Sequence, residues 1–326
     1  MKKILLAFLL LTACVSSQVS GIPEWYLNPP KNNSDRLYGV GYGGAVDQAA
    51  KLALNNISEQ ILVKISSDYE SREQEAKANE LSEYEANISR KVRSKTVDIE
   101  YSNYETEKSE NIAGNIYVLV SVSKDELVDN YLGEIAKTHA EIEALNKSVA
   151  GKTVVEKFAI YHAMNEIITI NENRIRIVQR VTRDKSKVAE FEKYYKDVLL
   201  EEFANRDKLV VKIVAKPSDE KFANAITESL NDLRIVTTDK DLTPKDPNGA
   251  LLRINTKTTH QKIYAAHIAK IQISIKLMEK FGKQIASNEI EVKGSSSISS
   301  TEAVNAAVTE LRQRILKEGA FKIFGL

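Results

Sequence analysis

Cys14 is the only cysteine among the 326 residues of this chain, and its thiol is the first group in the sequence able to do chemistry. A lone cysteine excludes an internal disulfide framework and a thiolate metal site elsewhere in the chain. The residues before it are Leu11-Thr12-Ala13, a branched apolar residue followed by two small ones that fit a peptidase pocket. We therefore expect cleavage before Cys14 and alkylation of its thiol by a lipid.

The amino-terminal segment supports this expectation. Lys2 and Lys3 precede an apolar run over residues 4–11, which is too short to cross a bilayer as a helix and is typical of a cleaved signal peptide. With Cys14, this pattern resembles the lipobox of bacterial lipoproteins. The alternative is an ordinary secretory signal that ends in a cysteine. In that family the residue after the cysteine directs sorting, and Val15 in place of an aspartate implies an anchor in the outer membrane. The resemblance leaves open which face of that membrane the protein occupies.

The overall charge excludes some partners. Lysine and arginine number 46 against 45 acidic residues, and removal of residues 1–13 lowers the formal charge from +1 to −1 because Lys2 and Lys3 are lost. This balance gives no indication of nucleic-acid binding. No other run approaches the roughly 18 apolar residues of a membrane span. The length predicts two modules, held to a membrane through the amino-terminal lipid.

Gly39-Val40-Gly41-Tyr42-Gly43-Gly44 fits the G-x-G-x-x-G pattern of dinucleotide-binding proteins, and Glu59 follows at about the expected distance. In a dinucleotide-binding fold, however, the pattern follows a buried strand and leads to further parallel strands. Here the strands expected next alternate as exposed antiparallel ones. We expect no cofactor, and we expect Gly39 and Gly41 to let a helix start close to the sheet and let an arm carrying Trp25 cross over it.

The other groups able to do chemistry are dispersed. The four histidines lack the helical spacing that would place two imidazoles on one metal, namely His139, His162, His260 and His267. Five serines over residues 295–300 have no histidine near them in the sequence, and we expect a helix cap at Ser300 or Thr301 there. No isolated carboxylate pair stands in an apolar setting. The sequence therefore predicts no catalytic residues and no metal site.

One basic cluster is a candidate for binding. Residues 174–187 hold six lysines and arginines with Asp184 as the one acidic residue, and Arg176, Arg180 and Arg183 share a helix face. Such a face could contact an anionic lipid headgroup, an anionic polymer such as peptidoglycan, or an acidic partner. The alternative is a solvated face neutralised by residues 68–110, where twelve acidic residues stand against seven basic ones.

The elements that would position these groups begin with residues 15–35, a tether in which Trp25 and Tyr26 lie between prolines and fold onto the globular body, by core packing rather than ligand contact. Periodicity then predicts a first module of the order β-α-β-α-β-β. Its elements are a strand over 37–42, a helix from 45 to 61, a strand over 61–66, a helix over 73–95, and a hairpin pairing 97–101 with 116–122.

The rest of the chain is expected to form a helical connector and a second module. Helical spacing continues from 125 to about 205, interrupted at Gly151, at residues 171–173 and at residues 184–186. The second module reads β-α-β-β-β-β-α. Its expected elements are strands at 209–215, 234–237, 252–256, 271–277 and 285–292, and helices at 218–233 and 301–317.

Four features of the first module resemble one family, the Lpp-twenty-type (LPP20) lipoprotein domain, which also occurs in flagellum-associated lipoproteins and assembly proteins. They are Pro23-x-Trp25-Tyr26-x-x-Pro29-Pro30, Leu37-Tyr38-Gly39-Val40-Gly41, the helix with Ala45, Ala49, Ala50 and Ala53, and the stretch from Ile61 to Ser67. The resemblance covers about residues 22 to 125. The second module is similar in element order to periplasmic TolB amino-terminal-like domains of flagellar outer-membrane ring proteins.

Pattern and resemblance together predict an α+β protein with two small sheet-plus-helix modules joined by a helical connector. The expected segments are 1–14 for the signal peptide and lipobox, 15–35 for the tether and Trp arm, 36–124 for the Lpp-twenty-like domain, 125–206 for the connector, and 207–326 for the TolB-like domain. The resemblance implies a lipid-anchored structural or interaction protein without enzymatic activity, in contact with envelope proteins or with copies of itself. A lipid-anchored ligand-binding protein or enzyme is the alternative.

Overall fold

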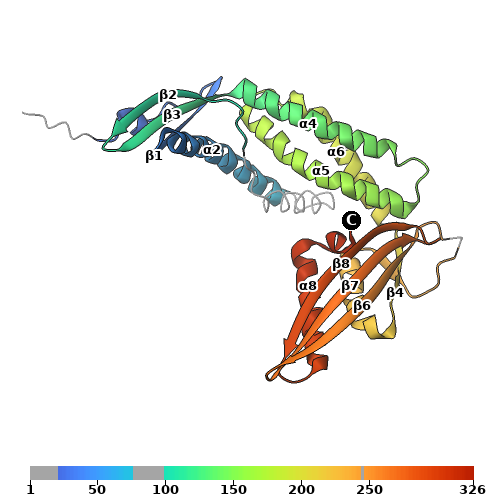
Figure 1. Cartoon of the computed structure of the whole chain (residues 1–326). Helices are drawn as coiled ribbons and strands as arrows, with labels where there is room; N and C mark the ends of the chain where they lie inside the picture. Colours follow the sequence, from blue (N-terminus) through green and yellow to red (C-terminus); the bar gives the residue numbers. More distant parts are fainter. Residues whose placement is uncertain (1–20, 76–98, 244–245) are drawn as a thin grey trace, which may run out of the picture. The chain divides into compact units, whose positions relative to one another are not determined.

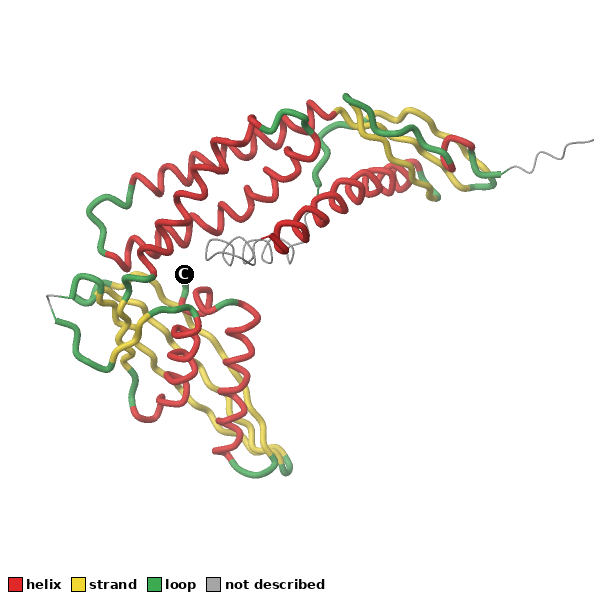
Figure 2. Tube along the Cα trace, turned by 180° about the vertical axis from the view of Figure 1, so that it is seen from behind, coloured by secondary structure: helices red, strands yellow, loops and turns green. Residues whose placement is uncertain are grey.

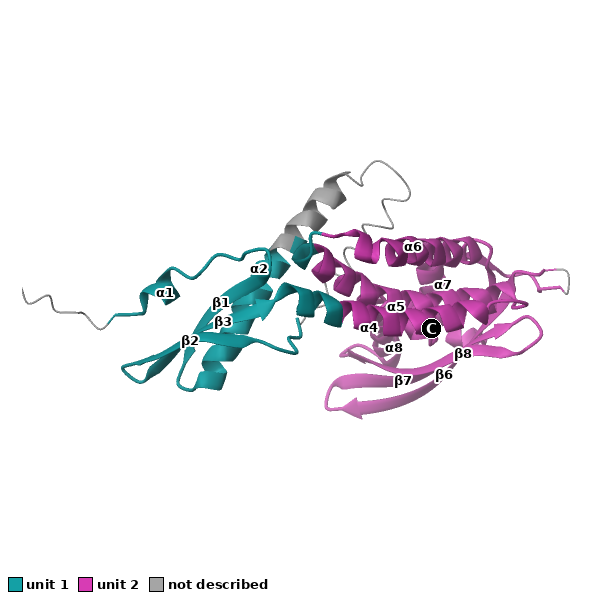
Figure 3. Cartoon of the chain, turned by 90° about the horizontal axis from the view of Figure 1, so that it is seen from above, with its two compact units in different colours: residues 1–83, 95–130, 180–183 teal, residues 84–94, 131–179, 184–326 magenta. Residues whose placement is uncertain are grey.

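A computed structural model describes residues 21–75, 99–243 and 246–326 of the chain. The chain divides into two compact units (Figure 3), of which one holds residues 1–83, 95–130 and 180–183 and the other residues 84–94, 131–179 and 184–326. The described residues form two sheets and several helices, so the predicted α+β class is confirmed.

The N-terminal unit is a three-stranded antiparallel sheet with a long helix on one face (Figure 1). Strand order is β1-β3-β2. The elements are α1 (Glu24–Leu27), β1 (Arg36–Gly43), α2 (Val46–Glu75), β2 (Glu105–Ile112) and β3 (Asn115–Ser123). Every second residue of β1 from Leu37 onward is buried. These residues share a face with Val118, Val120 and Val122, which lie against the buried alanines of α2.

Glycines allow α2 to lie unusually close to β1. A Cβ atom at Gly41 would overlap the carbonyl oxygen of Ala49, and one at Gly39 would overlap that of Ala53 and lie 2.7 Å from Cγ1 of Ile57. Ala49 and Ala53 are fully buried, which leaves the helix no room to retreat. The prediction that these glycines bring the helix close to the sheet is confirmed. The Trp25 arm lies on the opposite face of the sheet, where Tyr26 contacts Tyr42 and Tyr117.

The strand predicted over residues 61–66 is wrong, because α2 continues through it to Glu75. Ile61, Val63 and Ile65 alternate as in a strand, but Ile57, Ile61 and Ile65 also recur every four residues. The helical period prevails: Ile61 and Ile65 are buried, whereas Val63 is 69% exposed. Of the helix predicted over 73–95, residues 73–75 belong to α2 and residues 76–95 lie outside the described residues. Residues 97 and 98 of the strand predicted next lie outside them as well.

The predicted hairpin has the correct second strand and the wrong first one. β3 pairs with the polar stretch Glu105–Ile112, and residues 99–101, the described part of the predicted first strand, form no strand. Ala113 and Gly114 both have positive φ and join Ile112 directly to Asn115, as a two-residue hairpin turn requires. This turn fixes the partner strand immediately before it. Ile99 is buried outside any strand, and the hydroxyl of Tyr101 lies 2.9 Å from that of Ser58.

Three helices follow: α4 (Lys124–Lys147), α5 (Val154–Val181) and α6 (Ser186–Arg206). The breaks predicted at Gly151 and at 184–186 are confirmed, and the break predicted at 171–173 is wrong because α5 runs through it. Asn171 is fully buried there. Its amide donates to the hydroxyl of Tyr195 at 2.7 Å and accepts from that of Thr138 at 2.6 Å, so neighbouring helices satisfy the group that we expected to end this one.

The C-terminal sheet has the strand order β5-β4-β6-β7-β8, with parallel pairing around β4 and antiparallel pairing from β6 onward. The predicted element order is confirmed, with a short helix added at the end. Figure 2 shows the helices on one face of the strands. The elements are β4 (Val210–Val214), a 3-10 turn (Pro217–Asp219), α7 (Glu220–Asp232), β5 (Val236–Thr238), β6 (Gly249–Ile263), β7 (Ala266–Glu279), β8 (Gln284–Ser296), α8 (Ser300–Glu318) and α9 (Ala320–Phe324).

The helices and this sheet share one core. Val155 and Phe158 of α5 belong to the same buried apolar cluster as Ile273 of β7 and Leu311 of α8. Helical residues 131–179 and 184–206 therefore belong to one compact unit with the C-terminal sheet, whereas the sequence suggested a boundary near 206. The helix cap predicted at Ser300 or Thr301 is formed one residue earlier, where Ser299 accepts from the backbone N–H of Glu302.

Glu156 makes the stability of this unit sensitive to acid. Lys283 and the backbone N–H of Thr153 donate to its carboxylate, and they hold its pKa down to about 2 from an ordinary 4.5. A depressed folded-state pKa contributes stability that is present above about pH 4.5 and is lost as the pH falls toward about 2. We expect urea midpoints to fall over that window, and to fall less in Glu156→Gln. Equal losses in the two proteins would contradict this assignment.

Candidate functional site

Of the residues predicted to act, Cys14 lies outside the described residues, and the described part of the arm begins at residue 21. Trp25 and Tyr26 lie on α1, a single helical turn that starts after Pro23, whose carbonyl accepts from the backbone N–H of Tyr26 at 2.9 Å. Pro29 and Pro30 follow directly and cannot continue a helix. The sequence thus folds the arm locally into a turn that presents two adjacent aromatic side chains.

These rings join an aromatic cluster on the face of the sheet opposite α2. Tyr42 and Tyr117 are direct cross-strand partners, stacked with ring centroids 5.9 Å apart. Tyr26 meets both edge-on, at 5.0 Å from Tyr117 and 6.2 Å from Tyr42. Trp25 meets Tyr26 edge-on at 6.4 Å. Such pairs add roughly 0.5–1.5 kcal/mol each beyond burial. The predicted folding of the arm onto the body is therefore confirmed.

The cluster is only partly covered. Tyr42 is 52% exposed, and on the arm, near Trp25 and Tyr26 in the sequence, Ile22 and Leu27 are 46% and 59% exposed. Partial burial by the neighbouring rings raises the pKa of Tyr26, first through desolvation and then through Tyr42 and Tyr117. We call Ile22, Trp25, Tyr26, Leu27, Tyr42 and Tyr117 the aromatic patch. It is an apolar surface at the point where the tether joins the folded unit.

One hydrogen bond ties the arm to the sheet. The indole Nε1 of Trp25 donates to Oε1 of Glu110, on edge strand β2, at 2.6 Å. Because the bond crosses from the arm to a strand 85 residues later, it holds the arm at a defined place. The contact is exposed, which limits what it contributes to stability.

We expect Glu110→Ala to loosen the arm. The variant should raise acrylamide quenching of Trp25 and shift its emission to the red, while global stability falls by about 1 kcal/mol or less. Trp25 is the chain's only tryptophan, so emission reports on the arm alone. Glu59→Ala, at an exposed position of α2 in the same unit, is the matched control and should leave the emission unchanged. Unchanged quenching in Glu110→Ala would mean that the bond does not hold the arm.

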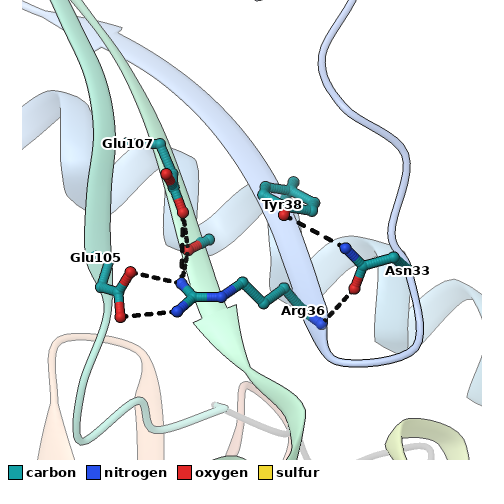
Figure 4. Close-up of polar contacts among 6 residues, drawn as sticks. Asn33, Arg36, Tyr38, Glu105 and Glu107 are labelled. Atoms are coloured by element: carbon teal, nitrogen blue, oxygen red, sulfur yellow. Dashed lines mark hydrogen bonds and ion pairs between the residues drawn. The ribbon is translucent and has the colours of Figure 1, made fainter.

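A charged cluster fixes the entry of the arm into β1 (Figure 4). The guanidinium of Arg36 donates to both carboxylate oxygens of Glu105, at 2.6 and 2.9 Å, and to the hydroxyl of Ser121 at 2.6 Å. The hydrogen bond between Arg36 and Glu105 raises the pKa of Arg36 and lowers that of Glu105. The side chain of Asn33 accepts from the backbone N–H of Arg36 at 2.7 Å and so shapes the turn before the strand. This cluster therefore holds the beginning of β1 on the sheet face that also carries the aromatic patch.

The predicted arginine face is less open than expected. Arg183 is exposed, whereas Arg176 and Arg180 are half-buried. Arg176 pairs with Glu172 of its own helix at 3.5 Å, and the neighbouring Arg174 pairs with Glu134 at 3.3 Å. Acidic residues of α4 and α5 therefore balance part of this charge. Contact of these arginines with an anionic partner stays a prediction.

Two side-chain pairs were not found from the sequence. His162 Nδ1 lies 2.8 Å from Oε1 of Glu202, and both side chains are buried between α5 and α6. His267 Nδ1 lies 3.2 Å from the hydroxyl of Ser300, so a histidine that is distant in the sequence lies beside the serine run. Each pair joins residues more than 30 positions apart, so spacing carried no signal.

Neither pair makes an evident catalytic group. Within the described ranges, no carboxylate contacts His267 to complete a serine triad, and no group of three or more His, Cys, Asp or Glu side chains could hold a metal ion. The glycine pattern lies in β1, which pairs antiparallel with β3, unlike the parallel strand that leads a dinucleotide site. No helix among the described residues is long and apolar enough to span a membrane.

The strand order and the arm allow the fold of the N-terminal unit to be compared with known families. Residues 23–123 match the family model of the LPP20 lipoproteins. The predicted Lpp-twenty-type resemblance is thereby confirmed for this segment, which runs from α1 to β3. The match ends at residue 123, so the likeness of the C-terminal module to TolB amino-terminal-like domains stays a prediction. No curated protein matches the chain.

Three solved structures are similar to this chain at low identity. The secreted protein HP1454 of Helicobacter pylori is 15% identical, with 89% of this chain and 99% of that chain covered and a TM-score of 0.46. A minor lipoprotein of Acinetobacter baumannii is 8% identical, with 35% of this chain and 91% of that chain covered and a TM-score of 0.29. Lipoprotein GNA1162 of Neisseria meningitidis is 10% identical, with 33% of this chain and 99% of that chain covered and a TM-score of 0.24.

Proposed function

We propose that this chain is a lipoprotein of the outer membrane, anchored by acylation of Cys14, with no catalytic activity of its own. Its role is to dock onto envelope proteins or onto copies of itself. The observation that carries the proposal is the aromatic patch at the base of the tether, which, apart from Ile22, lies in the segment that matches the LPP20 lipoproteins. A role in flagellar or motility-related assembly is the more specific version, and it rests on the resemblance alone.

The position of the patch supports docking near a membrane. The chain between Cys14 and Pro23 reaches at most roughly 30 Å even when fully extended. A lipid on Cys14 would therefore hold the patch within that distance of the bilayer surface. Clustered aromatic side chains with partial exposure are typical of protein interfaces, where rigid rings supply contact area at low entropic cost.

Photo-crosslinking in intact cells tests the docking role. A photoreactive residue in place of Tyr42 or Leu27 should form adducts with an envelope protein or with a second copy of the chain. The same residue in place of Val63 is the matched control, because Val63 is 69% exposed on α2 of the same unit. Gel filtration of the chain from Val15 onward distinguishes self-association from other partners. A monomer whose adducts at Tyr42 and Leu27 do not exceed those at Val63 would overturn the docking role.

A further inference from the structure

The β6–β7 hairpin of the C-terminal unit carries an unbalanced positive charge. Residues 249–279, which form the two strands and their turn, contain five lysines and arginines against one acidic residue, Glu279, in a chain whose overall charge is nearly balanced. The five are exposed, namely Arg253, Lys257, Lys262, Lys270 and Lys276. Lys270 pairs with Glu291 of β8 at 2.7 Å. The other four form no ion pair with any side chain in the described part of the chain.

The strand register places like charges opposite each other. Arg253 of β6 is the direct partner of Lys276 on β7, and Lys270 is the direct partner of Lys293 on β8. Glu291 neutralises the second of these pairs, at 2.7 Å from Lys270 and 3.4 Å from Lys293. Like charges directly opposite on one sheet face destabilise the sheet. The uncovered face of the hairpin is thus arranged to meet an anion outside the chain.

The tip of the same hairpin is apolar and strongly exposed. Tyr264 is 97% exposed and Ile263 is 49% exposed. His267 pairs with Ser296, which brings the loop after β8 beside the tip, and Ile298 in that loop is 79% exposed. Figure 2 shows the end of the hairpin next to the loop that leads into α8. Three large apolar side chains are therefore exposed at one end of the sheet.

The backbone at the tip argues for a role of Tyr264. Its φ is 54°, a left-handed conformation that is costly for a bulky residue. A two-residue turn with positive φ at its first central residue usually has glycine there, and this one has Tyr264. A strained, fully exposed aromatic at the end of a hairpin does not serve the folded state. It is consistent with a residue kept for contact with a partner.

We propose that the β6–β7 hairpin binds the surface of an anionic phospholipid bilayer, with its tip inserted between the headgroups. Tyrosine and aliphatic side chains lie favourably at the interface of a bilayer, while lysines just behind them contact anionic headgroups. Lys262, two residues from Tyr264, occupies that position. The inference builds on the proposed lipid anchor, since a tethered chain meets a membrane at high local concentration.

Vesicle binding by the chain from residue 14 onward with Cys14→Ala, which removes the acylation site, tests the hairpin alone. We expect flotation with vesicles of phosphatidylcholine plus phosphatidylglycerol, no flotation with phosphatidylcholine alone, and weaker binding in higher salt. Tyr264→Trp in a Trp25→Phe background should show a blue shift with the anionic vesicles. Because the protein is unacylated, a failure here says nothing against the anchor at Cys14.

Variants separate the tip from the charge. Ile263→Ser with Tyr264→Ser should abolish most binding, and each of Lys257→Gln and Lys262→Gln should weaken it roughly fivefold. Phe281→Ser is the matched control, because Phe281 is 72% exposed in the turn at the other end of β7 and should bind as the parent does. Thermal melting verifies that each variant is folded. Binding that does not depend on phosphatidylglycerol, or that persists in the tip variant, would overturn the proposal. Capture of protein partners without lipid binding would overturn it as well.

Discussion

A Gly41→Ala variant is expected to lose about 3 kcal/mol or more of the stability of the N-terminal unit. The added Cβ atom would overlap the carbonyl oxygen of Ala49 and the backbone nitrogen of Ala53, both on the buried side of α2. Helix backbone cannot move aside as a flexible side chain can, so the helix must leave the sheet and open the core. The loss should be confined to the unit that holds β1.

Urea unfolding followed by the emission of Trp25 measures this loss, because the chain's only tryptophan lies in the N-terminal unit. Circular dichroism of the same samples reports mainly on the helices and sheet of the other unit. Gly44→Ala is the matched control, since a Cβ at Gly44 would meet one atom at 3.9 Å, the side-chain oxygen of Gln48. If both glycine variants unfolded at the urea concentration of the parent, close packing of α2 on β1 would be refuted.

A His162→Leu variant is expected to destabilise the C-terminal unit by about 3 kcal/mol. His162 and Glu202 are each 7% exposed, and the substitution leaves the carboxylate of Glu202 with the amide of Asn165 at 2.6 Å as its remaining hydrogen-bond donor. Removing one partner of a buried pair is costly because the other stays without compensation. The ring centroid of His162 also lies 4.6 Å from that of Phe321, so its packing with α9 is affected.

The double variant His162→Leu with Glu202→Leu distinguishes the two causes. Removing both polar partners should recover a large part of the loss, because no buried carboxylate is then left unpaired. Urea unfolding by circular dichroism measures all three proteins. A double variant less stable than the single one would show that packing, and not the buried pair, dominates at this site.

The sequence predicted the elements wherever one hydrophobic period stood alone. Such periods predicted the helical region after β3, apart from the wrong break at 171–173, and the succession of elements in the C-terminal sheet. The errors arose where two signals competed. Ile57, Ile61 and Ile65 fit a helix as well as Ile61, Val63 and Ile65 fit a strand, and burial against β1 favoured the helix. The two-residue turn at Ala113 and Gly114 pairs β3 with the polar strand Glu105–Ile112, whereas the alternating residues 97–101 were predicted as its partner.

The candidate site could be predicted only in part. Proline spacing indicated that Trp25 and Tyr26 fold back onto the body, and the structure confirms it. Their partners Tyr42, Tyr117 and Glu110 were missed, because strand register and the position of the arm depend on contacts far apart in the sequence. Buried Asn171 was misjudged for the same reason: its partners lie on two other helices.

Acylation of Cys14 is the claim on which the proposed location depends, and mass spectrometry of the native protein's amino-terminal peptide tests it directly. We expect a peptide that begins at Cys14 and carries fatty acids, together with incorporation of labelled palmitate that Cys14→Ser abolishes. A native protein that still begins at Met1, or whose Cys14 thiol carries no lipid, would contradict the account.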